Sequence, residues 1–255
     1  MPKRLHQLLP EACSHTRWGK VLNDAVHLLG LHGRPQFIEP CGSDAIAKPL
    51  VLFMGGSADD RHKAVLNQVF KKYYGRYHAQ QAIGYGTFHQ VNTFIEYAKR
   101  WHMAGQKIIL VGHSYGGYGV MAVTRQLVEQ GIPVECLITL DPVACSIAIR
   151  DAVLMNPNSA KQWQPSPLLK QWINVYVDYE FIEQHAKKIG LPNIIALKGG
   201  PLRACEHAST NIKLATDLLG ESKYLVNAHQ LADVMFYALG LDKVLNLILA
   251  TTDEK

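Results

Sequence analysis

The turn at residues 112–116, with the sequence Gly-His-Ser-Tyr-Gly, constrains the fold of this 255-residue chain more than any other feature. It follows the apolar run 108–111 and precedes a stretch of helical periodicity that Gly131 ends. The pattern predicts a strand, a sharp turn with Ser114 at its apex, and then a helix. The glycines on either side of the serine carry no Cβ, which lets the strand and the helix approach each other closely.

A glycine-rich turn between a strand and a helix also occurs in nucleotide-binding folds. Here the G-x-G-x-x-G spacing is missing, and so is the Lys-Ser/Thr pair of a phosphate-binding loop. We therefore interpret the turn as a nucleophile elbow. The elbow holds the hydroxyl of Ser114 clear of the sheet at the start of a helix, where it can attack a substrate.

Short apolar runs alternate with helix-length stretches along most of the chain. Strands are predicted at residues 51–54, 82–85, 108–111, 134–140 and 172–177, an edge strand at 36–39, and helices at 19–30, 59–70, 91–103, 115–130, 180–189 and 231–249. The last apolar run before His207 is 194–197. This alternation predicts an α/β fold with a mostly parallel central sheet and helices on both faces. In such a sheet, ligands bind at the carboxyl ends of the strands.

Length and composition suit a single α/β domain over residues 1–255. Hydrophobic residues make up 48% of the chain and charged residues 18%, which argues against disorder. Residues 1–48 are interpreted as an N-terminal extension or as the first elements of the domain. Residues 141–171 are rich in Asn, Pro and Ser, so they are a candidate lid or insertion, with a plain surface connection as the alternative. Trp163 would contact an apolar substrate from such a lid.

Charge and targeting signals exclude several classes of protein. The net charge is +5, but the basic residues are scattered, so we expect no nucleic-acid partner. The N-terminus lacks the apolar core of a signal peptide, and no apolar run reaches the roughly 18 residues of a membrane span. We therefore expect a cytoplasmic location, with export by a route that needs no signal peptide as the alternative. The sequence leaves the oligomeric state open.

Cysteine and histidine spacing argues against a disulfide framework and a metal site. The five cysteines are odd in number and form no C-x-x-C pair, which is typical of reduced thiols. The five are Cys13, Cys41, Cys136, Cys145 and Cys205. No metal-binding spacing occurs among the twelve histidines. We expect neither a metal nor an organic cofactor.

A nucleophilic serine needs a base to take its proton and an acid to hold that base. Chains with this type of elbow carry them in the order serine, acid, histidine. Asp141 directly follows the run 134–140 and precedes Pro142, which places a carboxylate at the end of the neighbouring strand. Asp178 follows the next run and is the competing acid. The sequence context favours Asp141 and leaves Asp178 open.

The candidate base is His229, which lies just before the last predicted helix. His207 is the rival because it follows the preceding apolar run more closely. His113, inside the elbow, is expected to pack behind the site because its side chain does not easily face Ser114. An oxyanion hole needs two N–H donors. We assign one to the amide of Tyr115 and the other to the turn at Gly55 and Gly56, at the end of an upstream strand.

Three segments together resemble the α/β-hydrolase superfamily and look like its bacterial lipase-like serine hydrolases. They are residues 51–56, 111–117 and 140–143, the last with the sequence Leu-Asp-Pro-Val, and the resemblance spans about 49–240. More faintly, they are similar to lipase effectors that bacteria export without a signal peptide. The resemblance implies hydrolysis of carboxylic acyl esters through an acyl-serine, with a small-molecule or lipid ester as substrate. A lipase would also touch a membrane surface, although no feature of the sequence indicates this contact.

Other functions share the same residues. A thioesterase or an amidase would use the same Ser-Asp-His triad. A non-catalytic binding protein that retains the fold is disfavoured, because the serine, both candidate acids and both candidate histidines are all present.

Overall fold

The computed structural model describes residues 37–40, 44–56, 59, 63–143, 166–185, 193, 196–197, 201–214 and 228–250. The predicted helix at 19–30 lies outside these ranges, as do Trp163 and most of the candidate lid, residues 144–165. Three of the five cysteines, Cys13, Cys41 and Cys145, also lie outside them.

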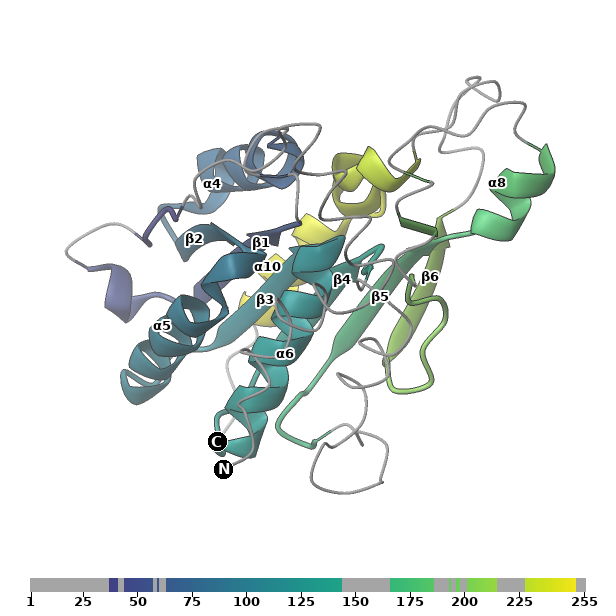
Figure 1. Cartoon of the computed structure of the whole chain (residues 1–255). Helices are drawn as coiled ribbons and strands as arrows, with labels where there is room; N and C mark the ends of the chain where they lie inside the picture. Colours follow the sequence, from purple (N-terminus) through teal and green to yellow (C-terminus); the bar gives the residue numbers. More distant parts are fainter. Residues whose placement is uncertain are drawn as a thin grey trace.

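Within these described residues, six strands form one sheet in the order β2-β1-β3-β4-β5-β6, and every neighbouring pair is parallel (Figure 1). The strands are β1 (Leu50–Gly55), β2 (Ala82–Thr87), β3 (Ile108–His113), β4 (Cys136–Leu140), β5 (Trp172–Val177) and β6 (Thr210–Leu214). The chain steps from β1 outward to β2, returns to the other side of β1 for β3, and then continues outward. The strand order therefore reverses between β1 and β3, and ligands of parallel sheets bind at such a switch point.

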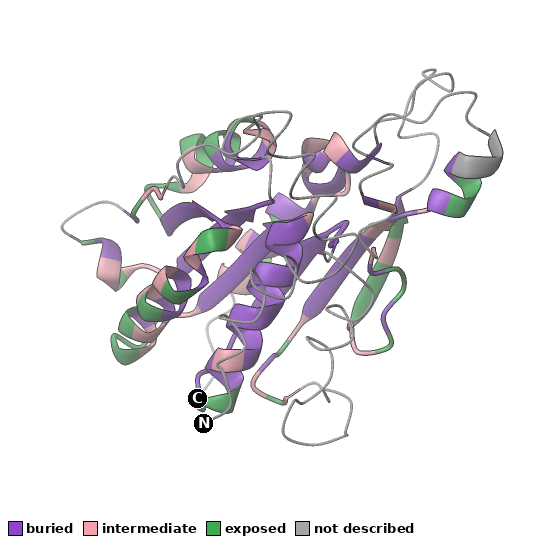
Figure 2. Ribbon diagram, in the orientation of Figure 1, coloured by how far each residue is buried: buried purple, intermediate pink, exposed green. Residues whose placement is uncertain are grey.

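Helices cover both faces of the sheet, as the alternating sequence pattern predicts (Figure 1). On one face lie α5 (Val91–Met103) and α6 (Tyr115–Glu129), which pack with Leu50, Leu52 and Leu110 in one core. On the other lie η2 (Ala64–Phe70), α4 (Lys71–Tyr77), η6 (Val234–Ala238) and α10 (Leu241–Ala250). The central strands are buried along their whole length because both of their faces are covered (Figure 2). The predicted α/β fold class is confirmed.

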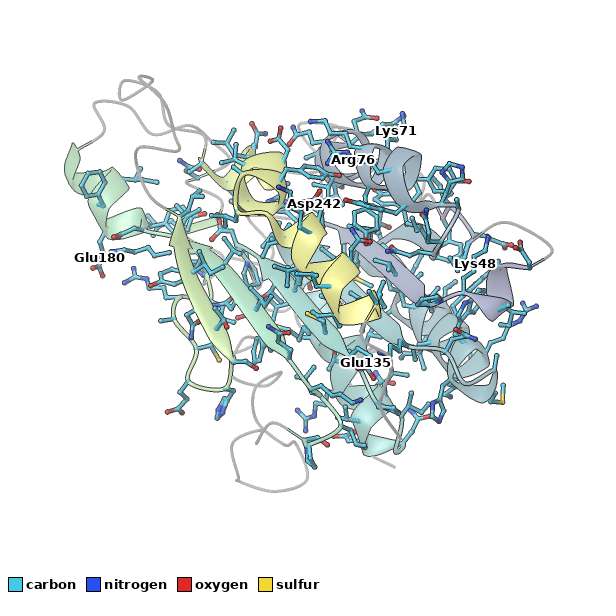
Figure 3. All side chains as sticks on the ribbon, turned by 180° about the vertical axis from the view of Figure 1, so that it is seen from behind. Lys48, Lys71, Arg76, Glu135, Glu180 and Asp242 are labelled. Carbon is cyan, nitrogen blue, oxygen red and sulfur yellow. The ribbon has the colours of Figure 1, made fainter. Side chains whose placement is uncertain are left out.

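The rear layer joins two parts of the chain that are far apart in sequence. Figure 3 shows α10 crossing the back of the sheet beside α4, with Arg76 and Asp242 labelled at their contact. The Arg76 guanidinium lies 3.0 Å from the carboxylate of Asp242, which is almost fully buried. The hydroxyl of Tyr77 donates to the same carboxylate at 3.3 Å. These contacts, with Phe236 packed against Phe53, hold the C-terminal helices on the sheet.

The last strand of the sheet differs from the prediction. Of the apolar run 194–197, the described residues Ala196 and Leu197 are helical, and the sixth strand is instead β6, which follows His207. Strand β6 has the sequence Thr-Asn-Ile-Lys-Leu, and most of its side chains are exposed or half-buried. It is attached through polar contacts, since Asn211 accepts a hydrogen bond from Asn174 of β5 at 3.0 Å. A strand of this kind has no apolar pattern to reveal it.

Several element ends also differ from the prediction. The predicted final helix is broken at Gly240, whose φ of 69° interrupts it between η6 and α10. Strand β4 begins at Cys136, because Val134 forms only an isolated bridge to Leu169. The expected edge strand at 36–39 is reduced to one antiparallel bridge from Ile38 to the edge strand β2. The other short elements of the described residues are η1 (Ala45–Ala47), η3 (Phe88–Gln90), α8 (Tyr179–His185) and η5 (Ala228–Gln230).

The close approach of strand and helix at the serine turn depends on Gly116. A Cβ on this residue would lie 2.7 Å from the carbonyl oxygen of Gly55 and would overlap that of Met54. Both atoms belong to the backbone of β1, so neither can move aside cheaply.

We therefore expect Gly116→Ala to lower the free energy of unfolding by about 3 kcal/mol, through overpacking against a central strand. Gly75→Ala is the matched control, since Gly75 is exposed in α4 with open space around its Cα. It should raise stability by about 0.5–1 kcal/mol because glycine weakens helices. Urea denaturation monitored by circular dichroism measures both. Equal stability of the two variants would contradict this account of the turn.

Candidate active site

Ser114 and Asp141 leave the sheet side by side. In the register of β3 and β4, His113 is paired with Leu140, so Ser114 and Asp141 are the next residues on the two strands. Both have a positive φ, 56° for Ser114 and 41° for Asp141, which is uncommon for residues other than glycine. The N–H of Ser114 donates to the carbonyl of Leu140 at 3.0 Å, and its own carbonyl accepts from Gly117 at 2.9 Å. These bonds hold the strained backbone in place.

A chain of hydrogen bonds connects the serine to the carboxylate through a histidine. The Nε2 atom of His229 lies 2.8 Å from Oγ of Ser114, and its Nδ1 atom lies 2.6 Å from Oδ2 of Asp141. An ionised carboxylate can only accept hydrogen bonds, so Nδ1 carries the proton. Nε2 is then unprotonated and accepts from the serine hydroxyl. In this tautomer the lone pair of Nε2 faces the hydroxyl of Ser114.

The Asp141 carboxylate is fully buried and accepts three hydrogen bonds. Its Oδ1 accepts from the backbone N–H of Val177 at 3.2 Å. Its Oδ2 accepts from His229 and also from the hydroxyl of Tyr179. A buried charge is costly unless it is paired and hydrogen-bonded, and these donors provide both.

His229 lies in η5, and its backbone is held on both sides. Its N–H donates to Oδ1 of Asn193 at 2.9 Å, and its carbonyl accepts from Nε2 of His113 at 2.6 Å. Burial, with the neighbouring His229 as a smaller cause, lowers the pKa of His113 to about 3. His113 is therefore a neutral donor near pH 7. As expected from the sequence, its side chain packs behind the site.

The turn after β1 lies directly against the serine. A Cβ on Gly56 would be 2.8 Å from Cβ of Ser114 and 3.1 Å from its Oγ, so only glycine allows this approach. Gly55 faces the other way, against the buried side chain of Asp59. Asp59 accepts from the N–H groups of Val65 and Leu66 at the start of η2.

Tyr115 opens α6 immediately after the serine, so its N–H lies at the helix N-terminus. Its ring packs edge-on against Phe88, with the ring centroids 4.5 Å apart. Ser114, Tyr115 and Gly56 thus meet where the strand order reverses.

The two alternative residues lie elsewhere. The Asp178 carboxylate pairs with Lys213 at 3.1 Å and accepts from the N–H of Phe181, which holds its pKa below the usual range. His207 lies beside Glu206, 3.7 Å from its carboxylate. The hydrogen bonds of Ser114 and Asp141 run to His229 instead.

Two residues that contact the site were missed by the sequence reasoning, Tyr179 and Asn193. A signal for Tyr179 was present in the alternation of β5. Ile173, Val175, Val177 and Tyr179 fall on one side and share the rear core, whereas Asp178 falls on the other. For Asn193 the sequence offers no such pattern.

Two further observations bear on the sequence expectations. Within the described residues, no helix is long and apolar enough to cross a membrane, and no three His, Cys, Asp or Glu side chains converge as metal ligands would. Cys136 and Cys205 are buried free thiols, and burial raises the pKa of both.

No protein-family model matches the chain, and no curated protein matches it in sequence. The chain is similar to the solved structure of Est1E from Butyrivibrio proteoclasticus, with 13% identity, a TM-score of 0.40, and coverage of 85% of this chain and 94% of that one. A thermostable esterase from Pseudomonas putida has 11% identity, a TM-score of 0.42, and coverage of 97% and 90%. The type II thioesterase YbtT of the yersiniabactin pathway has 11% identity, a TM-score of 0.41, and coverage of 84% and 99%.

The fold is that of the α/β-hydrolases. The strand order, the covering of both faces and the serine turn after β3 carry this assignment.

The buried His113 makes stability depend on pH. Its pKa is about 3 in the folded protein against an ordinary value of 6.5, so between these values the unfolded chain binds a proton that the folded chain does not. Above pH 6.5 His113 is neutral in both states, so its titration leaves the free energy of unfolding unchanged. As the pH falls from 6.5 towards 3, proton uptake by the unfolded chain progressively lowers this free energy. From pH 7 to pH 5 this group should cost the wild type about 2 kcal/mol of unfolding free energy. His113→Gln keeps an N–H donor that does not titrate, so it should lose correspondingly less in urea titrations at the two pH values. Equal losses in both proteins would contradict this role.

Proposed function

We propose that this protein is a serine hydrolase that cleaves carboxylic acyl esters through an acyl-serine intermediate, as lipases and esterases do. The observation that carries the proposal is the chain of hydrogen bonds from Oγ of Ser114 through His229 to the buried Asp141. Nucleophile, base and acid occur together in a geometry that acyl-transfer chemistry requires. These three side chains lie at the switch point of a parallel sheet, which supports the same interpretation.

In the first half-reaction, Ser114 Oγ attacks the carbonyl carbon of the ester while Nε2 of His229 takes the hydroxyl proton. The imidazolium that forms is stabilised by the Asp141 carboxylate 2.6 Å from Nδ1. When the tetrahedral intermediate collapses, the bond from carbon to the leaving oxygen breaks, and Nε2 returns the proton to the departing alcohol. The product of this step is an acyl-Ser114 ester.

In the second half-reaction, a water molecule replaces the alcohol. His229 takes a proton from the water as its oxygen attacks the acyl carbonyl, and then protonates Oγ of Ser114 as the acid leaves. The enzyme returns to its starting state, and the net reaction consumes one ester and one water. No step uses a metal or an organic cofactor.

The negative oxygen of both tetrahedral intermediates needs preorganised donors. We assign one to the N–H of Tyr115, which opens α6, and the other to the turn at Gly55 and Gly56. The close packing of Gly56 on Ser114 supports this assignment, because it brings backbone beside the reacting atom. The proposed substrates are small-molecule or lipid acyl esters.

We expect Ser114→Ala to abolish hydrolysis of a short-chain p-nitrophenyl ester, with kcat reduced on the order of 10⁶-fold, because the nucleophile is removed. The assay contains EDTA, and circular dichroism establishes that the variant is folded. Residual activity above a few per cent in the folded variant would sink the assignment of the nucleophile. Loss of wild-type activity in EDTA, with recovery on adding a divalent cation, would contradict the cofactor-free mechanism.

The acid and the base are tested against their own rivals. Asp141→Asn should reduce kcat by roughly 10⁴-fold, because the imidazole loses its tautomer and the partner of its charge, and His229→Ala should be at least as damaging. Asp178→Asn and His207→Ala are the matched controls and should keep most of the wild-type rate.

Labelling with a fluorophosphonate probe checks the same assignment without an ester substrate. Wild type and both control variants should label, and Ser114→Ala should not. A non-catalytic binding protein would not label in any form. Acyl thioesters and anilides in the substrate panel distinguish a thioesterase or an amidase.

A further inference from the structure

We propose that Tyr179 is a positioning residue that sets the basicity of the Asp141 carboxylate and, through it, the pH range in which His229 can act as a base. The proposal rests on the proposed function, since it concerns the regulation of the same site. The geometry that points to it is one oxygen atom, Oδ2 of Asp141, which contacts both Tyr179 and His229.

Tyr179 is directed into the site by the end of β5. It is the first residue of α8 and is 1% exposed, on the same side as the buried Val175 and Val177. Its neighbour Asp178 lies on the other side, where it caps α8 and pairs with Lys213. The end of β5 therefore supplies the phenol donor Tyr179, and not the acid Asp178, to the site. The acid that accepts from this phenol, Asp141, follows the adjacent strand β4.

The proton positions in this group follow from its chemistry. Nδ1 of His229 carries its own proton towards Asp141, and the phenol oxygen lies 3.3 Å from that nitrogen. The phenol proton therefore points to Oδ2 of Asp141, the acceptor between the two donors. Burial and the adjacent carboxylate raise the pKa of Tyr179 well above its ordinary value, so the phenol stays a donor throughout the range in which an imidazole titrates.

Two donors on one oxygen compete for its negative charge. The Tyr179 hydrogen bond stabilises the ionised carboxylate and makes it a weaker partner for a positively charged imidazole. His229 therefore remains neutral, and able to accept the Ser114 proton, at lower pH than it would beside the carboxylate alone. Removal of the phenol hydroxyl strengthens the remaining contact and favours the imidazolium.

The other groups that face His229 do not counteract this effect of Tyr179, which favours the neutral imidazole. His113, from the end of β3, is neutral because burial lowers its pKa to about 3. Ser114, at the start of α6, is uncharged, and the donor from Val177 to the other carboxylate oxygen is a backbone amide. Within the described residues, Asp141 from β4 and Tyr179 from α8 are the remaining titratable groups in contact with the imidazole.

The test is the pH profile of kcat/KM for p-nitrophenyl ester hydrolysis. In Tyr179→Phe the acid limb should move to higher pH by about one unit, which lowers kcat/KM about tenfold at pH values below the wild-type limb. Tyr73→Phe is the matched control, because it removes a buried phenol hydroxyl that donates to Gln81 at 2.7 Å, away from His229. Its acid limb should coincide with that of wild type. A purely structural role of Tyr179 would lower the rate at every pH and leave the acid limb in place, which would overturn the proposal.

A second readout separates this proposal from the proposed function. NMR titration of the His229 imidazole in the Ser114→Ala background needs no turnover, and adding Tyr179→Phe should move its midpoint upward by the same amount. A shifted titration in a protein whose wild type hydrolyses no ester would overturn the proposed function and leave the role of Tyr179 standing. An active wild type with an unshifted titration would overturn the role of Tyr179 alone.

If Tyr179→Phe does not fold, replacement of Tyr179 by 3-fluorotyrosine keeps the hydroxyl and makes it a stronger donor. The acid limb and the titration midpoint should then move to lower pH. Coincidence with wild type would overturn the proposal.

Discussion

Two neighbouring parallel strands, β3 and β4, end at the same level, and the residue that follows each of them has a positive φ. For residues other than glycine, such conformations cost on the order of 1–3 kcal/mol each, and they persist only where the surroundings hold them. Here the N–H of Ser114 is bonded to Leu140, and the N–H of Asp141 is bonded to Val175 of β5 at 2.7 Å. Backbone hydrogen bonds to the neighbouring strands thus hold Ser114 and Asp141 in their unfavourable conformations. The remainder of the site depends on this pair, because it fixes where a histidine must lie to contact both side chains.

The histidine that fills this place comes from a remote part of the chain. His229 is 115 residues beyond Ser114, and the rigid sheet alone does not orient it. Its backbone is bonded to His113 from β3 and to Asn193, so the strand that carries the serine also holds the histidine. A neutral His113 suits this purpose, since a second positive charge beside His229 would oppose the protonation that the proposed mechanism requires.

The sequence predicts the fold well where burial on both sides leaves a continuous apolar run. Strands β1, β3, β4 and β5 follow from such runs. Helices α5 and α6 follow from their apolar periodicity, and helix α5 has the predicted bounds. Strand β6 does not, because it is held by Asn211 and other polar groups. The break at Gly240 was missed because the apolar periodicity continues across it. The first error arises where tertiary contacts override the local pattern, and the second where a local glycine signal was set aside in favour of the apolar periodicity.

Some residues of the candidate site could be predicted from the sequence, and others could not. Ser114, Asp141 and His229 were each placed from the end of a strand or the start of a helix, and the structure brings these three within hydrogen-bond distance. Their catalytic roles remain a prediction. Asn193 could not be found from sequence, because its contact with His229 joins two segments that are 36 residues apart in the chain.

The polar character of β6 has a consequence for how the protein behaves in a crowded solution. In the part of the sheet that the structure describes, β6 is the last strand, which is where a further strand from another molecule could add. It is five residues long and has a lysine, Lys213, near its end, held by Asp178. Short, charged edge strands disfavour intermolecular pairing. The polar composition of β6, which made the strand hard to predict from sequence, therefore also disfavours edge-to-edge aggregation of the protein.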